Sequence, residues 1–188
     1  MVGGGIGGLA TAVALRRVGW SVTVLERADA FEEVGAGISL MSNAITSLDV
    51  LGLGDAVRDG SRPQLGGGMR TPSGAWLSRL DGAAVERELG VNAVVLPRPQ
   101  LLALLHGALP DESVITGATP SALVDDDHGV EVRYARAGQE GTLRPDLVVG
   151  ADGLRSWVRA QRWPDAPAPV HDGSTAWRAI TTAPVAPV

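Results

Sequence analysis

Cysteine is absent from this chain of 188 residues, and its absence excludes several kinds of site. Without cysteine there is no disulfide framework, no thiolate zinc site and no redox thiol. Histidine is scarce as well, and the three that occur have no partners at the spacing that metal ligands need: His106, His128 and His171. The sequence therefore predicts no metal site.

Two kinds of segment are also missing. No run of lysine and arginine occurs, and 16 basic against 21 acidic residues give a net charge of −5, so nucleic acid is not an expected partner. No apolar run approaches the roughly 18 residues of a membrane span, and we expect neither a membrane partner nor a signal peptide. With 45% hydrophobic and 20% charged residues, the composition predicts a globular cytoplasmic protein of one domain, or one domain and part of a second.

The chain does contain a glycine-rich stretch at its beginning. Gly3, Gly5 and Gly8 form the pattern G-x-G-x-x-G, and a helix-like run over 6–17 and a strand-like run over 20–26 follow. This order of loop, helix and strand is half of a dinucleotide-binding βαβ unit. In such a unit the first glycine allows a tight turn. The second lets the backbone approach a pyrophosphate, and the third allows close packing of helix and strand.

The start of the expected helix is a candidate anion site, because its N–H groups are free and the positive end of the helix dipole lies there. The candidate cofactor-binding residues of this loop are Gly3, Gly4, Gly5, Ile6, Gly7 and Gly8. The alternative is a glycine-rich turn that only packs a helix tightly.

Glu26 favours the cofactor interpretation. It ends the expected strand, eighteen residues after Gly8, where a dinucleotide site has an acid for the ribose hydroxyls. A carboxylate there would repel a 2′-phosphate, which favours FAD or NAD over NADP at this site. Arg27 is a further candidate, either against an adenine face or as a solvated side chain.

A second motif lies in the sequence DLVVGADGLRSWVR, residues 146–159. The apolar run 147–149 predicts a buried parallel strand, and a helix is expected to begin at Ser156. Ligands of open α/β sheets bind beyond the carboxyl ends of the strands, so Asp152 and Gly153 are candidate cofactor contacts. A turn that only caps a helix would explain these two residues but not the whole run.

Arg98 precedes a third expected helix, which the pattern places from Pro99 onward. A cation at the start of a helix is unfavourable without an anion nearby, and a surface arginine is the alternative.

Together with the two motifs, residues 35–55 resemble flavoprotein monooxygenases, the aromatic-hydroxylase family of the p-hydroxybenzoate hydroxylase type. The resemblance rests here on Gly35-Ala36-Gly37-Ile38, Asn43-Ala44 and the run LGLGD over 51–55. It implies that the loop at 35–38 passes near the flavin and that Arg98 contacts the phosphate and ribose of the cofactor. It also implicates the run around Asp152 in binding FAD and reduced nicotinamide. The Gly54-Asp55-Ala56 triplet is expected to be a turn and cap.

The expected fold class is α/β, with a Rossmann-like FAD-binding domain and a partial β-sheet substrate domain. Residues 1–63 and 97–165 are assigned to the first, and strands from 64–96 and 170–188 to the second, with Trp177-Arg178 marking the re-entry into the substrate sheet. Within 64–96 we expect a hairpin around Pro72-Ser73-Gly74.

Three further local expectations follow. In the hairpin, Trp76 is expected either to line a pocket or to lie in the core. The runs ALVDDD and GVEVRYAR are expected to pair across a turn at 127–129. The consecutive aspartates Asp125 to Asp127 are expected to be solvated rather than to bind a metal.

The resemblance implies an FAD-dependent, NADH- or NADPH-dependent monooxygenase that hydroxylates a small aromatic or polyketide-like substrate through a flavin hydroperoxide. No catalytic residue is assigned, because the cofactor carries this chemistry. The alternatives are another flavoenzyme on the same scaffold, a halogenase or a reductase, and an incomplete FAD-binding module without turnover. Since the family continues further and few residues precede Gly3, we expect an N-terminal fragment, a misplaced start or a split gene. The oligomeric state is left open.

Overall fold

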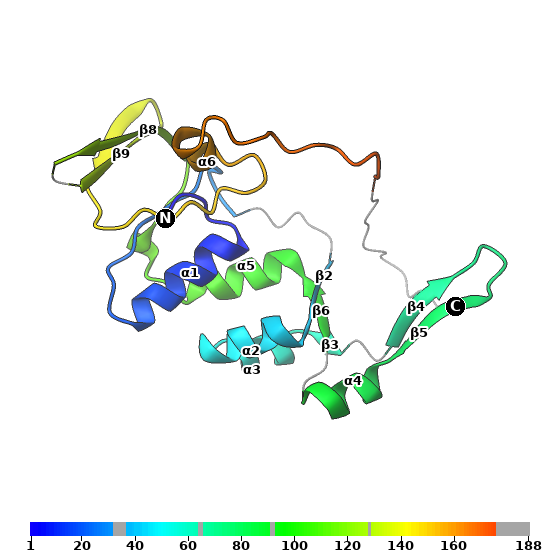
Figure 1. Ribbon diagram of the computed structural model, residues 1–188. Helices are drawn as coiled ribbons and strands as arrows, with labels where there is room; N and C mark the ends of the chain where they lie inside the picture. The colour runs from blue at the N-terminus through cyan, green and yellow to red at the C-terminus, as the bar shows by residue number, and fades with distance from the viewer. Residues whose placement is uncertain (32–36, 64–65, 91–92, 128, 176–188) are drawn as a thin grey trace. The chain divides into compact units, whose positions relative to one another are not determined.

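The computed structural model describes residues 1–31, 37–63, 66–90, 93–127 and 129–175 (Figure 1). The chain divides into two compact units. One holds Met1–Glu32 and Leu105–Ala176, and the other holds Glu33–Leu104 and Trp177–Val188.

The first unit is built around a short parallel ladder. β1 (Val24–Leu25) pairs in parallel with β7 (Val114–Ile115). Val2 forms parallel bridges to Leu25 on one side and to Gly150 on the other. The segment before the glycine loop therefore lies between β1 and the segment that ends at Gly150. Parallel pairing joined through a helix is the arrangement that an α/β fold requires, and the predicted fold class is confirmed at this level.

Helix α1 (Ile6–Arg17) covers this ladder with its small and apolar face, and the helix predicted over 6–17 is found with those bounds. Leu9 and Val13 are buried. Arg16 and Arg17 occupy the last turn, where cations complement the negative end of the helix. The chain then turns at Gly19, whose φ of 92° is in the left-handed region.

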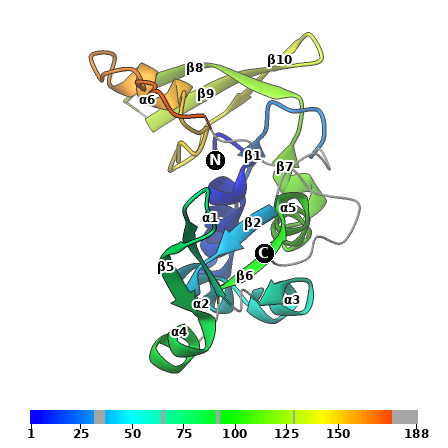
Figure 2. The same ribbon diagram turned by 90° about the vertical axis from the view of Figure 1, so that its right-hand side faces the viewer.

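An antiparallel sheet completes the first unit. β8 (Ala118–Asp126) pairs with β9 (Gly129–Arg136), which pairs with β10 (Gln139–Leu143), as the alternating sequence predicted for the first two. Leu25, Ala118 and Val132 form the core between this sheet and the parallel ladder. The unit also contains η1 (Asp111–Ser113) and α6 (Trp157–Arg162), and Figure 2 shows α6 beside β8 and β9.

The second unit contains an antiparallel sheet in the order β2-β6-β3 and a separate hairpin, β4-β5. Its strands are β2 (Gly37–Leu40), β3 (Arg62–Pro63), β4 (Gly66–Arg70), β5 (Trp76–Asp81) and β6 (Val94–Pro97). Its helices are α2 (Ser42–Val50), α3 (Gly54–Asp59) and α4 (Gly82–Leu89), and α5 (Arg98–Gly107) runs from this unit into the first. The hairpin predicted around 72–74 is present.

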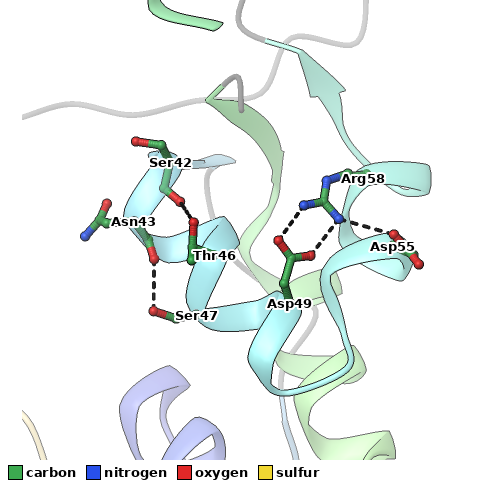
Figure 3. A network of polar contacts seen from close by, with 7 residues as sticks. All are labelled: Ser42, Asn43, Thr46, Ser47, Asp49, Asp55 and Arg58. Atoms are coloured by element: carbon green, nitrogen blue, oxygen red, sulfur yellow. Dashed lines mark hydrogen bonds and ion pairs between the residues drawn. The ribbon is translucent and has the colours of Figure 1, made fainter. Parts of the chain in front are cut away.

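An arginine joins the two helices that follow β2. Arg58 of α3 donates to both carboxylate oxygens of Asp49 on α2, at 2.7 and 2.6 Å, and to Asp55 at 3.2 Å (Figure 3). Gly54 lies beneath this contact, since a Cβ atom there would be 1.8 Å from Oδ1 of Asp49. The Gly54-Asp55-Ala56 triplet was predicted to be a turn and cap, but it forms the first turn of α3.

Several predicted elements differ from the structure. The expected parallel strand at 147–149 is reduced to the single bridge at Gly150, and Leu147 is 48% exposed rather than buried. The side chain of Trp76 is 44% exposed, so of the two expectations for it, the one that placed it in the core is wrong. Helix α5 begins at Arg98, one residue before the predicted start. In the described ranges, no helix is long and apolar enough to cross a membrane.

Candidate cofactor-binding site

The glycine loop leaves the carboxyl end of the central strand of the first unit. The N–H of Val2 donates to the carbonyl oxygen of Val149 at 2.9 Å, and the carbonyl oxygen of Val2 accepts from the N–H of Ala151 at 2.7 Å. On the other side the N–H of Gly3 donates to the carbonyl oxygen of Leu25 at 2.8 Å. These bonds bring both sequence motifs to one edge of the sheet, which is where open α/β folds bind ligands.

Gly3 and Gly8 are required by the protein itself. Gly3 has a φ of 104°, and a Cβ atom there would lie 2.5 Å from the carbonyl oxygen of Ala151. A Cβ atom on Gly8 would lie 2.0 Å from the carbonyl oxygen of Gly3. Both positions face fixed backbone, so a side chain would displace the loop.

Gly5 faces open space instead. No protein atom lies within 4 Å of the position of its missing Cβ atom, and its φ of −70° is one that any residue adopts. Gly5 is the N-cap of α1, where no side-chain cap is made and the first turn holds no acidic residue. The chain therefore leaves a cradle beside uncapped N–H groups, which suits a diphosphate.

The Glu26 carboxylate is fixed beside this loop. Its Oε2 accepts from the N–H of Gly4 at 2.7 Å, and its Oε1 accepts from the N–H of Ala28 at 2.8 Å. A Cβ atom on Gly4 would lie 2.9 Å from both Cβ and Oε2 of Glu26, so this second residue of the loop is also held to glycine. Each oxygen keeps a further lone pair for a hydroxyl donor. Arg27 is exposed and makes no ion pair with the residues described.

The Asp152 carboxylate caps helix α6. It accepts from the hydroxyl of Ser156 at 2.5 Å and from the N–H groups of Trp157 at 2.6 Å and Val158 at 3.0 Å. Partial burial on its own would raise the pKa of Asp152, but these hydrogen bonds outweigh it and lower the pKa below the ordinary value. Ser156 in turn accepts from the N–H of Arg159 at 2.9 Å.

Because the Asp152 carboxylate caps α6, the second motif offers a cofactor its backbone rather than this side chain. The side chain of Asp152 already has its partners within the protein, and Gly153 has a φ of 85° in the turn that follows. The alternative that the sequence left open, a turn that caps a helix, therefore describes the Asp152 side chain. The same turn touches the glycine loop through Ala151, whose carbonyl oxygen and Cβ lie against Gly3 and Gly8.

Arg98 lies in the other compact unit, as the exposed first residue of α5. It makes no ion pair with another described residue, which leaves its guanidinium available to an anion. Gly35 and Ala36 of the expected flavin loop, and the expected strand around Trp177-Arg178, lie outside the described residues.

Ion pairs that the sequence did not indicate involve the consecutive aspartates, and one of them attaches the last residue of α6 to β8. Arg162, the last residue of α6, donates to both carboxylate oxygens of Asp125 on β8. Arg144 pairs with Asp126 at 2.8 Å and with Glu131 at 2.5 Å. Asp125 and Asp126 are exposed, as predicted for a solvated turn, but both also form ion pairs that the sequence did not indicate. A partner 37 residues away cannot be read from one sequence.

Metal chemistry finds no support in this region. Among the described residues, no group of three or more histidine, aspartate and glutamate side chains could hold a metal ion.

Comparisons with known proteins agree on one family. A family model described as an FAD binding domain matches residues 1–187. The chain is 39% identical over 180 residues to an aurachin C monooxygenase/isomerase of Stigmatella aurantiaca, covering 96% of this chain and 46% of that protein. It is 35% identical to a 3-hydroxybenzoate 6-hydroxylase of Polaromonas naphthalenivorans, covering 88% and 42%. The chain spans less than half the length of these relatives.

Solved structures give the same result. The flavin-dependent monooxygenase PieE, in complex with FAD and substrate, matches with a TM-score of 0.74 at 28% identity over 86% of this chain and 31% of that one. HpxO of Klebsiella pneumoniae, complexed with FAD and uric acid, matches with a TM-score of 0.73 at 27% identity over 85% and 40%.

Proposed function

This chain belongs to the FAD-binding domain family of FAD-dependent monooxygenases, and we propose that it supplies the part of such an enzyme that holds the adenosine and pyrophosphate of FAD. Bound FAD would supply the redox chemistry, taking electrons from NADH or NADPH and using oxygen to hydroxylate a small aromatic or polyketide-like substrate. The residues described here would bind and orient that cofactor.

One observation supports this assignment more than the others. Gly5 leaves an unfilled position at the uncapped start of α1, while Gly3 and Gly8 on either side are packed against backbone. A turn that only packed a helix would need the two filled positions but not the open one. The open position fits a group that approaches the backbone closely, as a pyrophosphate does in dinucleotide sites.

The charges beside the loop support the same ligand. A diphosphate would accept from the N–H groups at the start of α1, and the ribose hydroxyls would donate to the carboxylate of Glu26. The bonds from Gly4 and Ala28 hold that carboxylate in one orientation before any ligand arrives. Preorganisation of this kind lowers the cost of binding. Arg27 and Arg98 remain our proposals for contacts with the adenine and the phosphates.

The turn at Asp152 and Gly153 would serve the cofactor mainly through its backbone. The Asp152 carboxylate caps α6 and thereby fixes the turn at 151–153. Ala151 of this turn packs against the glycine loop. We assign no catalytic residue, since no described side chain is required to carry the redox step itself.

The test is a titration of the purified chain with FAD, followed by absorbance and flavin fluorescence, and then by oxidation of NADH and NADPH. A perturbed, saturable flavin spectrum is expected. Because the chain spans less than half of its relatives, an FAD-binding module without turnover is the second candidate, and binding without NADH or NADPH oxidation would favour it. Complete loss of flavin on gel filtration would contradict cofactor binding by this chain.

A further inference from the structure

The β4-β5 hairpin holds two arginines against one indole ring. The Cζ atom of Arg70 lies 3.9 Å from the centroid of the Trp76 ring, and that of Arg79 lies 5.4 Å from it. Both distances are within the roughly 6 Å over which a cation is attracted to an aromatic ring. All three side chains are exposed, with 44% of Trp76 accessible.

The backbone of the hairpin explains why the three side chains meet. Arg70 is opposite Trp76 in the ladder, and Gly68 is opposite Arg79. A Cβ atom on Gly68 would lie 2.8 Å from Cζ3 of Trp76, so the glycine makes room for the indole to lie across the hairpin. The ring can then contact the guanidinium opposite it and the one further along its own strand.

No acid balances these two charges within the described residues. Neither Arg70 nor Arg79 makes an ion pair there. The carboxylate of the same hairpin, Asp81, accepts from the N–H of Ala83 at 2.9 Å and caps α4. Two guanidiniums held on one ring repel each other, and they leave a local excess of positive charge on a chain whose net charge is −5.

We propose that Arg70, Trp76 and Arg79 form an anion-binding site for a phosphomonoester. Each guanidinium presents a planar fork of donors that matches phosphate oxygens. A phosphomonoester carries a charge of about −1.5 to −2 at pH 7. That charge balances both cations, whereas a carboxylate would leave one unbalanced. The phosphate could be the 2′-phosphate of NADPH, a source that rests on the proposed function, or a phosphate from elsewhere.

The probes are 2′-AMP, inorganic phosphate, adenosine and acetate, each titrated into the 188-residue chain and followed by calorimetry at low salt. Saturable binding of 2′-AMP or phosphate is expected, with R70Q and R79Q each weakening it at least about tenfold, the size of one lost charge-assisted contact. Arg62→Gln removes an exposed charge of the same unit and should leave the affinity unchanged. Affinity should fall as the pH drops below about 6, where the phosphate loses its second charge.

The two sources give different rankings. If 2′-AMP binds more tightly than phosphate, and R70Q and R79Q do not change any binding of adenosine or acetate, the site is specific for a nucleotide 2′-phosphate. Equal binding of 2′-AMP and phosphate indicates a site for the phosphate group alone. Absence of binding, or affinities that R70Q and R79Q leave unchanged, would overturn the proposal. Because phosphate and adenosine can also enter the cradle proposed at the start of α1, only the loss of affinity in R70Q and R79Q assigns binding to the hairpin. Circular dichroism of both variants checks folding.

Discussion

At the scale of single residues, the glycines of the loop divide into two kinds. Gly3 and Gly8 are constrained by backbone atoms of the protein, and Gly5 is not constrained by any described atom. The spacing in the sequence predicted the turn at the first glycine and the close packing at the third. It could not predict that Gly8 packs against Gly3 itself, because that contact depends on how the loop folds back.

Gly8→Ala tests the packed position. The added methyl group would meet the carbonyl oxygen of Gly3 at 2.0 Å, so the free energy of unfolding should fall by about 1–3 kcal/mol or more, as overpacking does. Gly7→Ala is the matched control, since it is an exposed helical position with no atom within 4 Å. It should be neutral or stabilising by up to about 1 kcal/mol. Urea unfolding of both variants measures the difference, and equal stabilities would contradict the account.

Asp152 is the residue whose ionisation matters most to the second motif. Its pKa is lowered in the folded chain, so it contributes stability that is present above the unfolded value near 3.8 and is lost as the pH falls through the folded pKa. Asp152→Ala should lower the free energy of unfolding at pH 7 by about 0.5–2 kcal/mol, the usual cost of losing a helix cap. It should also flatten the loss of stability below pH 4. Thermal unfolding from pH 7 down to pH 3 tests this, and parallel curves for the two proteins would count against the capping role.

At the scale of elements, α6 is short but is held at both ends. Asp152 and Ser156 bond its first N–H groups, and Arg162 ties its last residue to Asp125 on β8. A helix of six residues has little stability of its own, so these contacts decide where it lies. The sequence predicted where this helix begins, because the capping residues are local, but it could not reveal the distant ion pair.

Exchanging the charges of that ion pair tests the second attachment. The Arg162 guanidinium lowers the pKa of Asp125 by donating to it. Asp125→Arg and Arg162→Asp should each speed amide hydrogen exchange in α6, because each places like charges together. The double variant should restore slow exchange, since it restores an opposite pair. If the double variant exchanges as fast as the single variants, the pair does not position α6.

At the scale of the whole molecule, the sequence was sufficient to predict the α/β class, the family, and the hairpins at 66–81 and 118–136. Each of these depends on local signals, such as the glycine spacing of the loop or the turn residues at 72–74. Exposure was predicted less well, and Leu147 and Trp76 show why. An apolar residue is buried only if another element covers it, and one sequence does not say which elements meet. The division into 1–63 with 97–165 and 64–96 with 170–188 stays a prediction.

The central claim is that the first unit binds FAD through the open position at Gly5, and one measurement tests it directly. FAD is titrated into the wild-type chain and into Gly5→Ala, followed by flavin fluorescence, with urea unfolding of both proteins. The methyl group would occupy the approach of the pyrophosphate, so the affinity should fall at least about tenfold. The free energy of unfolding should stay within about 1 kcal/mol, since the φ of −70° suits alanine. Equal FAD affinity in the two proteins would contradict the account.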